Sequence, residues 1–472
     1  MQDSRVSAST DPKATRESPR RRRRSSLWIP PYRSFTIGLL LVVTLVAFEA
    51  MGVATALPTI ASELDGQRWY SWSFTLFMAA SAVGTVLAGR LADHRGPALP
   101  LLLALPLFAA GLVLAGAAPN MPVLLAARAL QGMGGGSVAV PLYVLIARVY
   151  PERDRPRAFG AMSAAWVVPA LVGPAVSGLI TEHLHWRWVF LGLAPLVLLG
   201  TVFLASTVLS SGSERAEGAR QRPGLVPAAL GAGVGTLGVN WAAQHPGAVS
   251  AVLGTLAAVL LWRCFRVLLP AGTLRARPGV PMLVLARGLL AGVFFAAEAF
   301  VPLVLTVVHG YSPALAGVPL TLGSLGWSLG AFLQSRWERI SREGMVALGF
   351  LLVVAAVAGV GAIAPSWGPG WLVLLSWSLG GAGMGIAITS TAVGVLGRSE
   401  ESARGFNSAA LQLSDMLGQA LLIGLGGVLV NLLSDAGDPT AGVLVLSATL
   451  IVIGLTGARL VIRSGRTILD GR

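Results

Sequence analysis

Residues 89–96 read Gly-Arg-Leu-Ala-Asp-His-Arg-Gly and separate two long apolar stretches that start near Phe74 and Ala98. Placing several charged side chains beside a bilayer is energetically unfavourable unless they find partners nearby. We therefore expect a tight connection between two membrane helices. In it, Gly96 would permit the turn and Gly89 a close approach to a neighbouring helix. Asp93 could accept hydrogen bonds from the amides at a helix N-terminus or pair with an Arg of another helix, and Arg95 lies beside it in the sequence. The alternative is an ordinary polar turn.

The composition places this connection in a membrane protein. The chain has 472 residues, of which 54% are hydrophobic and only 12% are charged, whereas a soluble domain has about one quarter charged residues. The single cysteine, Cys264, excludes an internal disulfide bond. We therefore expect an all-α integral membrane protein with many spans.

Fourteen stretches approach the roughly 20 apolar residues that a spanning helix needs. The first, Phe35 to Leu57, is longer than the apolar region of a signal peptide, about 7–15 residues, and we interpret it as an uncleaved helix. The seventh and eighth are the least secure. The stretches start near Phe35, Phe74, Ala98, Val123, Phe159, Trp188, Leu225, Val249, Val284, Ala314, Val346, Trp371, Phe406 and Gly442.

The basic residues support this number and predict an orientation. With the N-terminus inside, nearly all Arg and Lys fall in cytoplasmic connections, and only Arg68 and Arg187 lie outside. Removing one span would move the later basic clusters to the wrong side. The net charge of +14 resides largely in such loops and in the run Arg20–Arg24, so it indicates membrane topology and no nucleic-acid partner.

We expect two six-helix bundles with an extra helix pair between them, and both termini in the cytoplasm. The predicted organisation is a disordered Arg-rich tail (1–33), an N-terminal bundle (34–208), a linker (209–224), two extra helices (225–270), a second linker (271–283), a C-terminal bundle (284–464) and a short tail (465–472).

Two further motifs lie inside predicted spans. Arg128, Gln131 and Gly132 follow an Arg-x-x-Gln-Gly pattern, and an Arg in a span costs roughly 2.5–3.5 kcal/mol unless it finds a partner or snorkels to the interface. A stripe of small residues would let another helix pack closely and rock. The alternative is a generic packing face, which would carry little information about function. The stripe includes Pro169, Gly173, Pro174, Ser177 and Gly178.

Together these motifs resemble those of the major facilitator superfamily, and the fourteen spans resemble its drug:proton antiporter branch. The resemblance implies a major facilitator fold, in which residues 89–96 form a conformational switch. It also ties Arg128 to proton coupling, and it links the stripe from Pro169 to Gly178 to exporters over importers. The corresponding loop of the second bundle, Gln334–Gly344, keeps basic residues but lacks the glycine-aspartate pattern.

Three carboxylates lie inside predicted spans: Glu49, Glu298 and Asp415. Such acids are rare in membranes and mark functional sites, and removal from water favours their protonated form. We rank Glu49 first as a proton carrier, then Glu298 in its aromatic segment, then Asp415. For each, the alternative is a hydrogen bond that only joins helices. The expected substrate contacts are Glu49, Gln131, Trp166, Phe295, Glu298 and Gln412.

No phosphate-binding loop, nucleophile elbow or metal-ligand spacing competes with this interpretation. The sequence therefore predicts no enzyme, cofactor or metal site, and a carrier driven by an ion gradient. We expect a monomeric, multi-pass protein of the cytoplasmic membrane that exports small amphipathic compounds in exchange for protons. The alternatives are an exporter of one natural product, siderophore or lipid, a proton-coupled importer, a membrane sensor and, as the enzyme alternative, an integral-membrane transferase.

Overall fold

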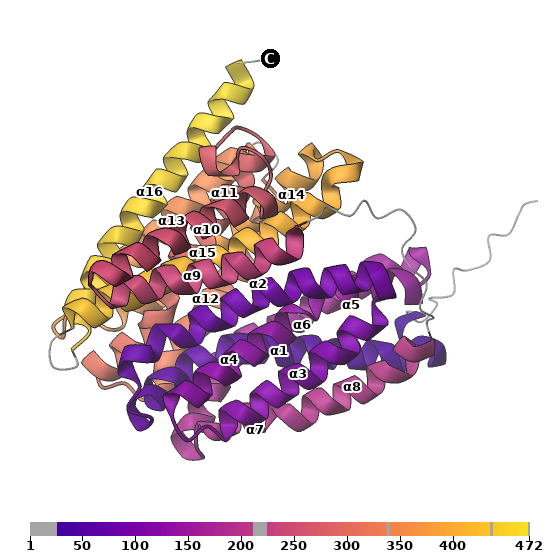
Figure 1. The fold of residues 1–472 in the computed structure, drawn as a ribbon, viewed down its shortest axis with the longest axis horizontal. Helices are drawn as coiled ribbons and strands as arrows, with labels where there is room; N and C mark the ends of the chain where they lie inside the picture. The colour runs from indigo at the N-terminus through magenta and orange to yellow at the C-terminus, as the bar shows by residue number, and fades with distance from the viewer. Residues whose placement is uncertain (1–25, 211–223, 338–339, 435–437, 471–472) are drawn as a thin grey trace, which may run out of the picture.

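The computed structural model describes residues 26–210, 224–337, 340–434 and 438–470 (Figure 1). Within these residues, fourteen helices are long and apolar enough to cross a membrane. The predicted all-α membrane fold is therefore confirmed, and the seventh and eighth spans are among these helices. The run Arg20–Arg24 lies outside the described residues.

The helices form an N-terminal bundle, an extra pair and a C-terminal bundle. The N-terminal bundle contains α1 (Pro30–Glu63), α2 (Tyr70–Arg95), α3 (Ala98–Gly116), α4 (Met121–Gly136), α5 (Ala139–Val149), α6 (Arg155–His183), α7 (Arg187–Leu191) and α8 (Leu193–Ser210). The pair is α9 (Leu225–Gln244) and α10 (Ala248–Leu268). The C-terminal bundle contains α11 (Val280–Leu303), α12 (Pro313–Gln334), α13 (Arg342–Ile363), α14 (Leu372–Arg398), α15 (Arg404–Leu433) and α16 (Thr440–Asp470).

The helix ends differ from the predicted boundaries in a few places. Helix α1 already begins at Pro30, inside the predicted tail of residues 1–33, and α16 continues to Asp470. The fourth span is two helices, α4 and α5, because a run of three glycines ends α4 at Gly136. Proline inside a span does not break it: α6 is continuous through Pro169 and Pro174, since neighbouring helices compensate for the lost hydrogen bonds.

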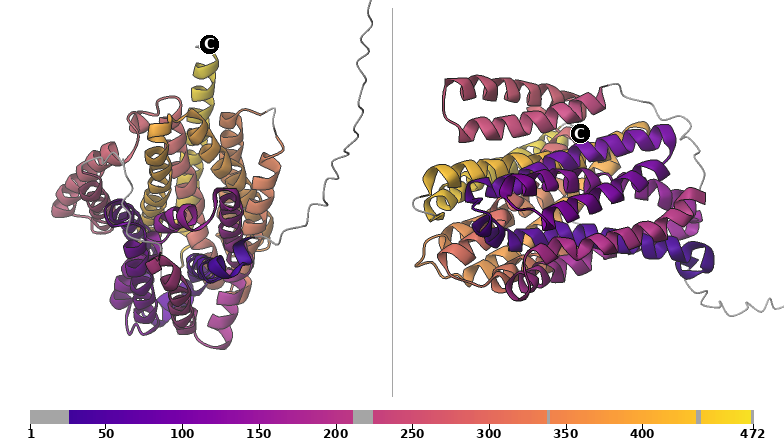
Figure 2. Two further views of the ribbon diagram at one scale, coloured as in Figure 1. Left: turned by 90° about the vertical axis from the view of Figure 1, so that its right-hand side faces the viewer. Right: turned by 60° about the horizontal axis from the view of Figure 1, so that its bottom comes forward.

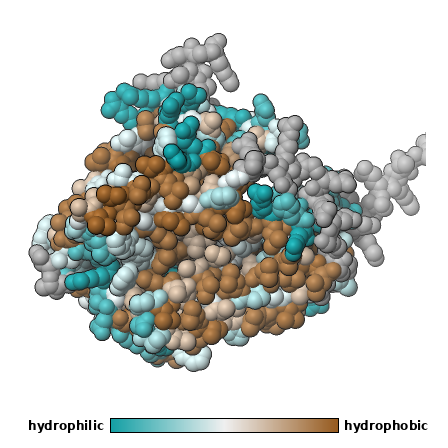
Figure 3. All heavy atoms as spheres, viewed as in Figure 1, coloured by the Kyte–Doolittle hydropathy of each residue, from teal (hydrophilic) through white to brown (hydrophobic). Residues whose placement is uncertain are grey.

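Hydrogen bonds join the two bundles at the ends of their helices that lie away from residues 89–96, and the contact of α2 with α15 continues along α2 to Thr85, whose hydroxyl lies 3.9 Å from the Met416 sulfur. The Tyr70 hydroxyl donates to the Ala299 carbonyl at 2.7 Å, and the Asn431 amide donates to the Arg68 carbonyl at 2.8 Å. Helices α2 and α15, and α6 and α12, form most of the contacts between bundles, and α1 also contacts α11 and α12. On the face shown in Figure 3, apolar residues cover the middle of the helices, and hydrophilic residues gather near their ends.

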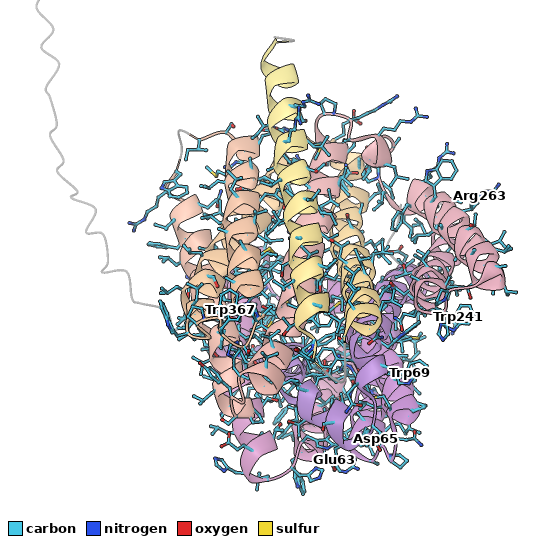
Figure 4. The ribbon with its side chains drawn as sticks, turned by 90° about the vertical axis from the view of Figure 1, so that its left-hand side faces the viewer. Glu63, Asp65, Trp69, Trp241, Arg263 and Trp367 are labelled. Carbon is cyan, nitrogen blue, oxygen red and sulfur yellow. The ribbon has the colours of Figure 1, made fainter. Side chains whose placement is uncertain are left out.

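Helices α9 and α10 pack against each other on the outside of the bundles (Figure 2). Helix α9 contacts both α2 and α15, and therefore both bundles. The Trp72 indole donates to Gln244 Oε1 at 3.0 Å, and the buried Asn240 amide donates to the Ala420 carbonyl at 3.4 Å. Trp241 and Arg263 mark opposite ends of this pair, while Glu63, Asp65 and Trp69 lie at the end of the N-terminal bundle away from the C-terminus (Figure 4).

Candidate functional site

The N-terminal bundle encloses an ion pair between Glu49 of α1 and Arg128 of α4. The two side chains are 0% and 3% exposed, so both charges lie away from lipid and water. A buried charge is stable only when it is paired and hydrogen-bonded. Arg128 therefore meets a partner inside the bundle and does not snorkel to the interface.

Neighbouring groups hold Arg128 in place. Its Nη1 donates to Gln131 Oε1 at 2.6 Å, and its Nε donates to the Ser73 carbonyl at 3.3 Å. Its guanidinium lies 4.3 Å from the centre of the Phe77 ring. Gln131, one turn further along α4, is itself buried. In this conformation Gln131 orients Arg128, and both Gln131 and Glu49 are enclosed. The substrate contacts assigned to these two residues stay predictions.

Glu298 of α11 lies in the C-terminal bundle beside an aromatic cluster. The Trp377 indole of α14 donates to its Oε2 at 3.1 Å. The Trp377 ring stacks on Phe294 at 4.8 Å, and Phe294 and Phe295 both contact Trp327 of α12. The structure thus places Glu298 and Phe295, both predicted to contact substrate, in one partly exposed group. Sequence reasoning missed Trp327 and Trp377, which come from other helices.

Asp415 of α15 forms an ion pair with Arg287 of α11. Arg287 Nη2 lies 2.9 Å from Asp415 Oδ2, and Gln419 donates to Oδ1 at 2.8 Å. Arg287 Nη1 also donates to the Ile388 carbonyl at 3.1 Å. The arrangement fits the alternative considered for Asp415, a polar link between helices. Nothing in the sequence indicates that Arg287 and Asp415 form a pair, because they are 128 positions apart.

The connection at residues 89–96 has the predicted turn but not the predicted partners. Gly96 has a φ of 78°, a conformation that favours glycine. Asp93 is exposed, and Arg90 and His94 are its neighbouring charges. Within the described part of the chain, Asp93 makes no hydrogen bond or ion pair with another helix. Arg95 is also exposed.

The packing role predicted for Gly89 is wrong in this conformation. A Cβ atom there would meet only Val140, at an ordinary distance of 3.8 Å. The close contact of α2 lies instead at Gly84, whose neighbour is the Met133 backbone of α4. Gly89 lies more than one helical turn beyond Gly84, where α2 and α4 have separated.

The small-residue stripe of α6 contacts α1 on one side and α12 on the other. The Ser177 hydroxyl donates to the Gly52 carbonyl at 2.7 Å. At Gly178, a Cβ atom would lie 2.6 Å from the Ala314 Cα atom of the other bundle. Pro174 lies against Gly317, whereas Gly173 makes only ordinary contacts with α1, and Pro169 is buried. The stripe therefore joins the two bundles.

The remaining predicted contacts are dispersed. Trp166 is 41% exposed on α6, and Gln412 is partly exposed on α15. Neither makes a side-chain hydrogen bond within the described ranges. Among the same residues, no three His, Cys, Asp or Glu side chains are grouped as a metal site.

The weak internal repeat seen at Gln334–Gly344 extends to the two carboxylate sites, and sequence reasoning missed this extension. Glu298 and Trp377 follow Glu49 and Arg128 by the same 249 residues, and both pairs are separated by 79 positions. A shared Gly-x-Gly-x-Gly pattern, at residues 132–136 and 381–385, was the available signal. In both copies these glycines pack on a helix backbone: Gly132 meets Phe77 of α2, and Gly381 meets Gly323 of α12.

Two helical bundles related by an internal repeat, with paired charges in their interior, are typical of secondary transporters. A family model described as the Major Facilitator Superfamily matches residues 39–421. The chain therefore belongs to the major facilitator superfamily and is a transporter, not an enzyme.

Similar proteins agree with this assignment. A probable multidrug-efflux transporter of Mycobacterium tuberculosis is 28% identical over 412 residues, which cover 82% of this chain and 86% of the relative. The transporter of the acurin A biosynthesis cluster of Aspergillus aculeatus is 32% identical over 208 residues, 42% of this chain and 37% of that protein. A solved bacterial homolog of the human lysosomal transporter Spinster, inward-facing and unoccupied, shares the fold with a TM-score of 0.65 at 16% identity, covering 94% of this chain and 98% of that one.

Proposed function

We propose that this transporter exports small amphipathic compounds across the cytoplasmic membrane in exchange for protons. The observation that carries the proposal is the enclosed ion pair between Glu49 and Arg128. A titratable carboxylate and a permanently charged guanidinium in the interior of a bundle can change the local charge by one proton. The relatives named as multidrug-efflux transporters favour export of drug-like compounds.

The geometry of Glu49 suits a reversible proton site. Arg128 binds its Oε1 atom. The Oε2 atom is buried and has no hydrogen-bond partner among the described residues. A proton can therefore add to Oε2 while the contact through Oε1 persists. Neutralising Glu49 weakens its attraction for Arg128 and changes the interaction between α1 and α4.

In this proposal the structure corresponds to the state that is open to the cytoplasm. The hydrogen bonds of Tyr70 and Asn431 join the bundles at the ends away from residues 89–96, and the positive-inside rule places that loop in the cytoplasm. Asp93 lacks a partner on another helix in this state and would gain one when the cytoplasmic ends close. A proton bound at Glu49 must favour one of the two states over the other, because a ligand shifts an equilibrium only through differential affinity.

The first prediction concerns Glu49 itself. In inverted vesicles with an imposed pH gradient, Glu49→Gln should abolish export of labelled compounds, because the amide does not titrate. Glu49→Asp is the matched control, since it keeps a titratable carboxyl group, and it should retain measurable export. Amounts of each variant in the membrane are compared by blotting. Full export by a folded Glu49→Gln protein would refute the role assigned to Glu49.

The same assay separates broad efflux from export of a single product. The acurin-cluster relative covers only part of the chain, but it makes a dedicated exporter the second candidate. A panel of unrelated labelled compounds should show several substrates for a multidrug exporter. Transport restricted to one compound would favour the dedicated function.

A further inference from the structure

The internal repeat places two carboxylates in equivalent positions with different partners. Glu49 and Glu298 lie in the first helix of each bundle, and Arg128 and Trp377 lie in the fourth span. In both copies the fourth-span residue donates a hydrogen bond to the carboxylate. The chemical difference is one side chain: a guanidinium in the N-terminal copy and an indole in the C-terminal copy.

This difference leaves the charge of Glu298 without a counter-charge. The guanidinium of Arg128 is always positive and balances Glu49, whereas the indole of Trp377 is a neutral donor. Among the described residues, no Arg, Lys or His side chain forms an ion pair with Glu298. An uncompensated carboxylate in a poorly solvated site is unfavourable and attracts a positive partner.

The surroundings of Glu298 suit a cation with an apolar body. Four rings from three helices form one cluster, Phe294, Phe295, Trp327 and Trp377, and the Trp377 indole joins this cluster to the carboxylate. Phe294 and Trp377 are 2% and 0% exposed, while Phe295, Trp327 and Glu298 remain partly exposed. Aromatic faces attract cations, most strongly where water is excluded. A carboxylate next to exposed aromatic surface recognises charge and apolar shape together.

We propose that Glu298 and this aromatic cluster bind an organic compound that carries one positive charge on an apolar body. Trp377 is the residue that determines this specificity, because it occupies the position equivalent to Arg128 and brings no positive charge to the carboxylate. An arginine at position 377 would reproduce the pair between Glu49 and Arg128 and close the site to cations. The inference rests on the proposed export function and names its substrate class.

The experiment measures equilibrium binding of tetraphenylphosphonium to the purified full-length protein in detergent, at constant pH and without a gradient. Glu298→Gln removes the charge and should weaken binding about tenfold or more. Trp377→Arg supplies an internal cation and should weaken binding as strongly. Trp377→Phe keeps a ring but loses the N–H group, and it should retain most of the affinity. Trp371, an exposed tryptophan at the N-cap of α14, lies outside the cluster. Trp371→Phe is therefore the matched control and should bind like the original chain.

Unchanged binding by folded Glu298→Gln overturns the inference, and so does equal loss of affinity in Trp377→Phe and Trp377→Arg. Size-exclusion chromatography and thermal unfolding confirm that each variant is folded. Because Glu298→Gln is nearly isosteric, it tests the inference even where Trp377→Arg fails to fold. Export of the same probe under a pH gradient is measured separately. Binding that depends on Glu298 without gradient-driven export would support the cation site and reject proton exchange.

Discussion

At the residue scale, the pair of Glu49 and Arg128 couples the protonation of one side chain to the placement of several others. Arg128 contacts Glu49, Gln131, Ser73 and Phe77 from three helices. Loss of one charge leaves the other buried without compensation, which typically costs about 3–5 kcal/mol. Loss of both charges avoids that penalty.

A double-mutant cycle tests this coupling. Arg128→Gln should lower the unfolding temperature of the purified protein markedly, because Glu49 then carries an unpaired buried charge. Glu49→Gln should lower it as well, although the Ser73 carbonyl and the Phe77 ring still stabilise Arg128. The double variant Glu49→Gln/Arg128→Gln should be more stable than Arg128→Gln alone. Additive losses in the double variant would show that the two charges do not stabilise each other.

At the element scale, α6 makes contacts within its own bundle and with α12 of the other bundle. Gly178 lies at a close approach of the α6 backbone to the start of α12: a Cβ atom there would be 2.7 Å from the Pro313 carbonyl oxygen. Close contacts of this kind depend on the absence of a side chain. A larger residue at position 178 therefore acts on the contact between bundles and leaves the core of each bundle intact.

Gly178→Val should disfavour the closed arrangement of these helix ends and reduce export. Protein amount and unfolding temperature should change little, since the contact joins two separately packed bundles. Gly160 lies on the same helix with no atom within 4 Å of an added Cβ, so Gly160→Val is the matched control. If both substitutions reduce export equally, the contact at Gly178 has no special role.

The helices themselves were largely predictable, because the thickness of a bilayer requires long apolar runs and the basic residues indicate which ends share a side. Contacts between helices were not, since they depend on how each helix is rotated about its axis. Arg287 and Asp415 are separated by 128 positions, and Gly89 was assigned a contact that Gly84 makes. The repeat that relates Glu49 to Glu298 was present in the sequence, but its glycine spacing becomes informative only once both copies are seen to pack on a neighbouring backbone.

At the scale of the whole molecule, the two bundles and the α9–α10 pair are connected at the same end. Helix α9 is tied to the N-terminal bundle through Trp72 and Gln244 and to the C-terminal bundle through Asn240 and Ala420. Any motion that separates the bundles at this end must break at least one of these hydrogen bonds. The extra pair therefore moves with one bundle or is rearranged in each transport cycle.

Alternating access requires this end to open, and a cross-link between the bundles tests that requirement. Arg68 and Asn431 come from different bundles and are joined by a hydrogen bond at 2.8 Å. In a Cys264→Ala background, which removes the single native cysteine, the pair Arg68→Cys/Asn431→Cys should be cross-linked by a short reducible reagent. Export should then stop and should return on reduction.

The control pair Glu63→Cys/His185→Cys joins two residues at the same end but within one bundle, where the native side chains lie 3.3 Å apart. Its cross-link should leave export intact, because α1 and the segment before α7 move together. Export that continues at full rate through protein cross-linked between Arg68→Cys and Asn431→Cys would mean that the bundles do not separate here during transport.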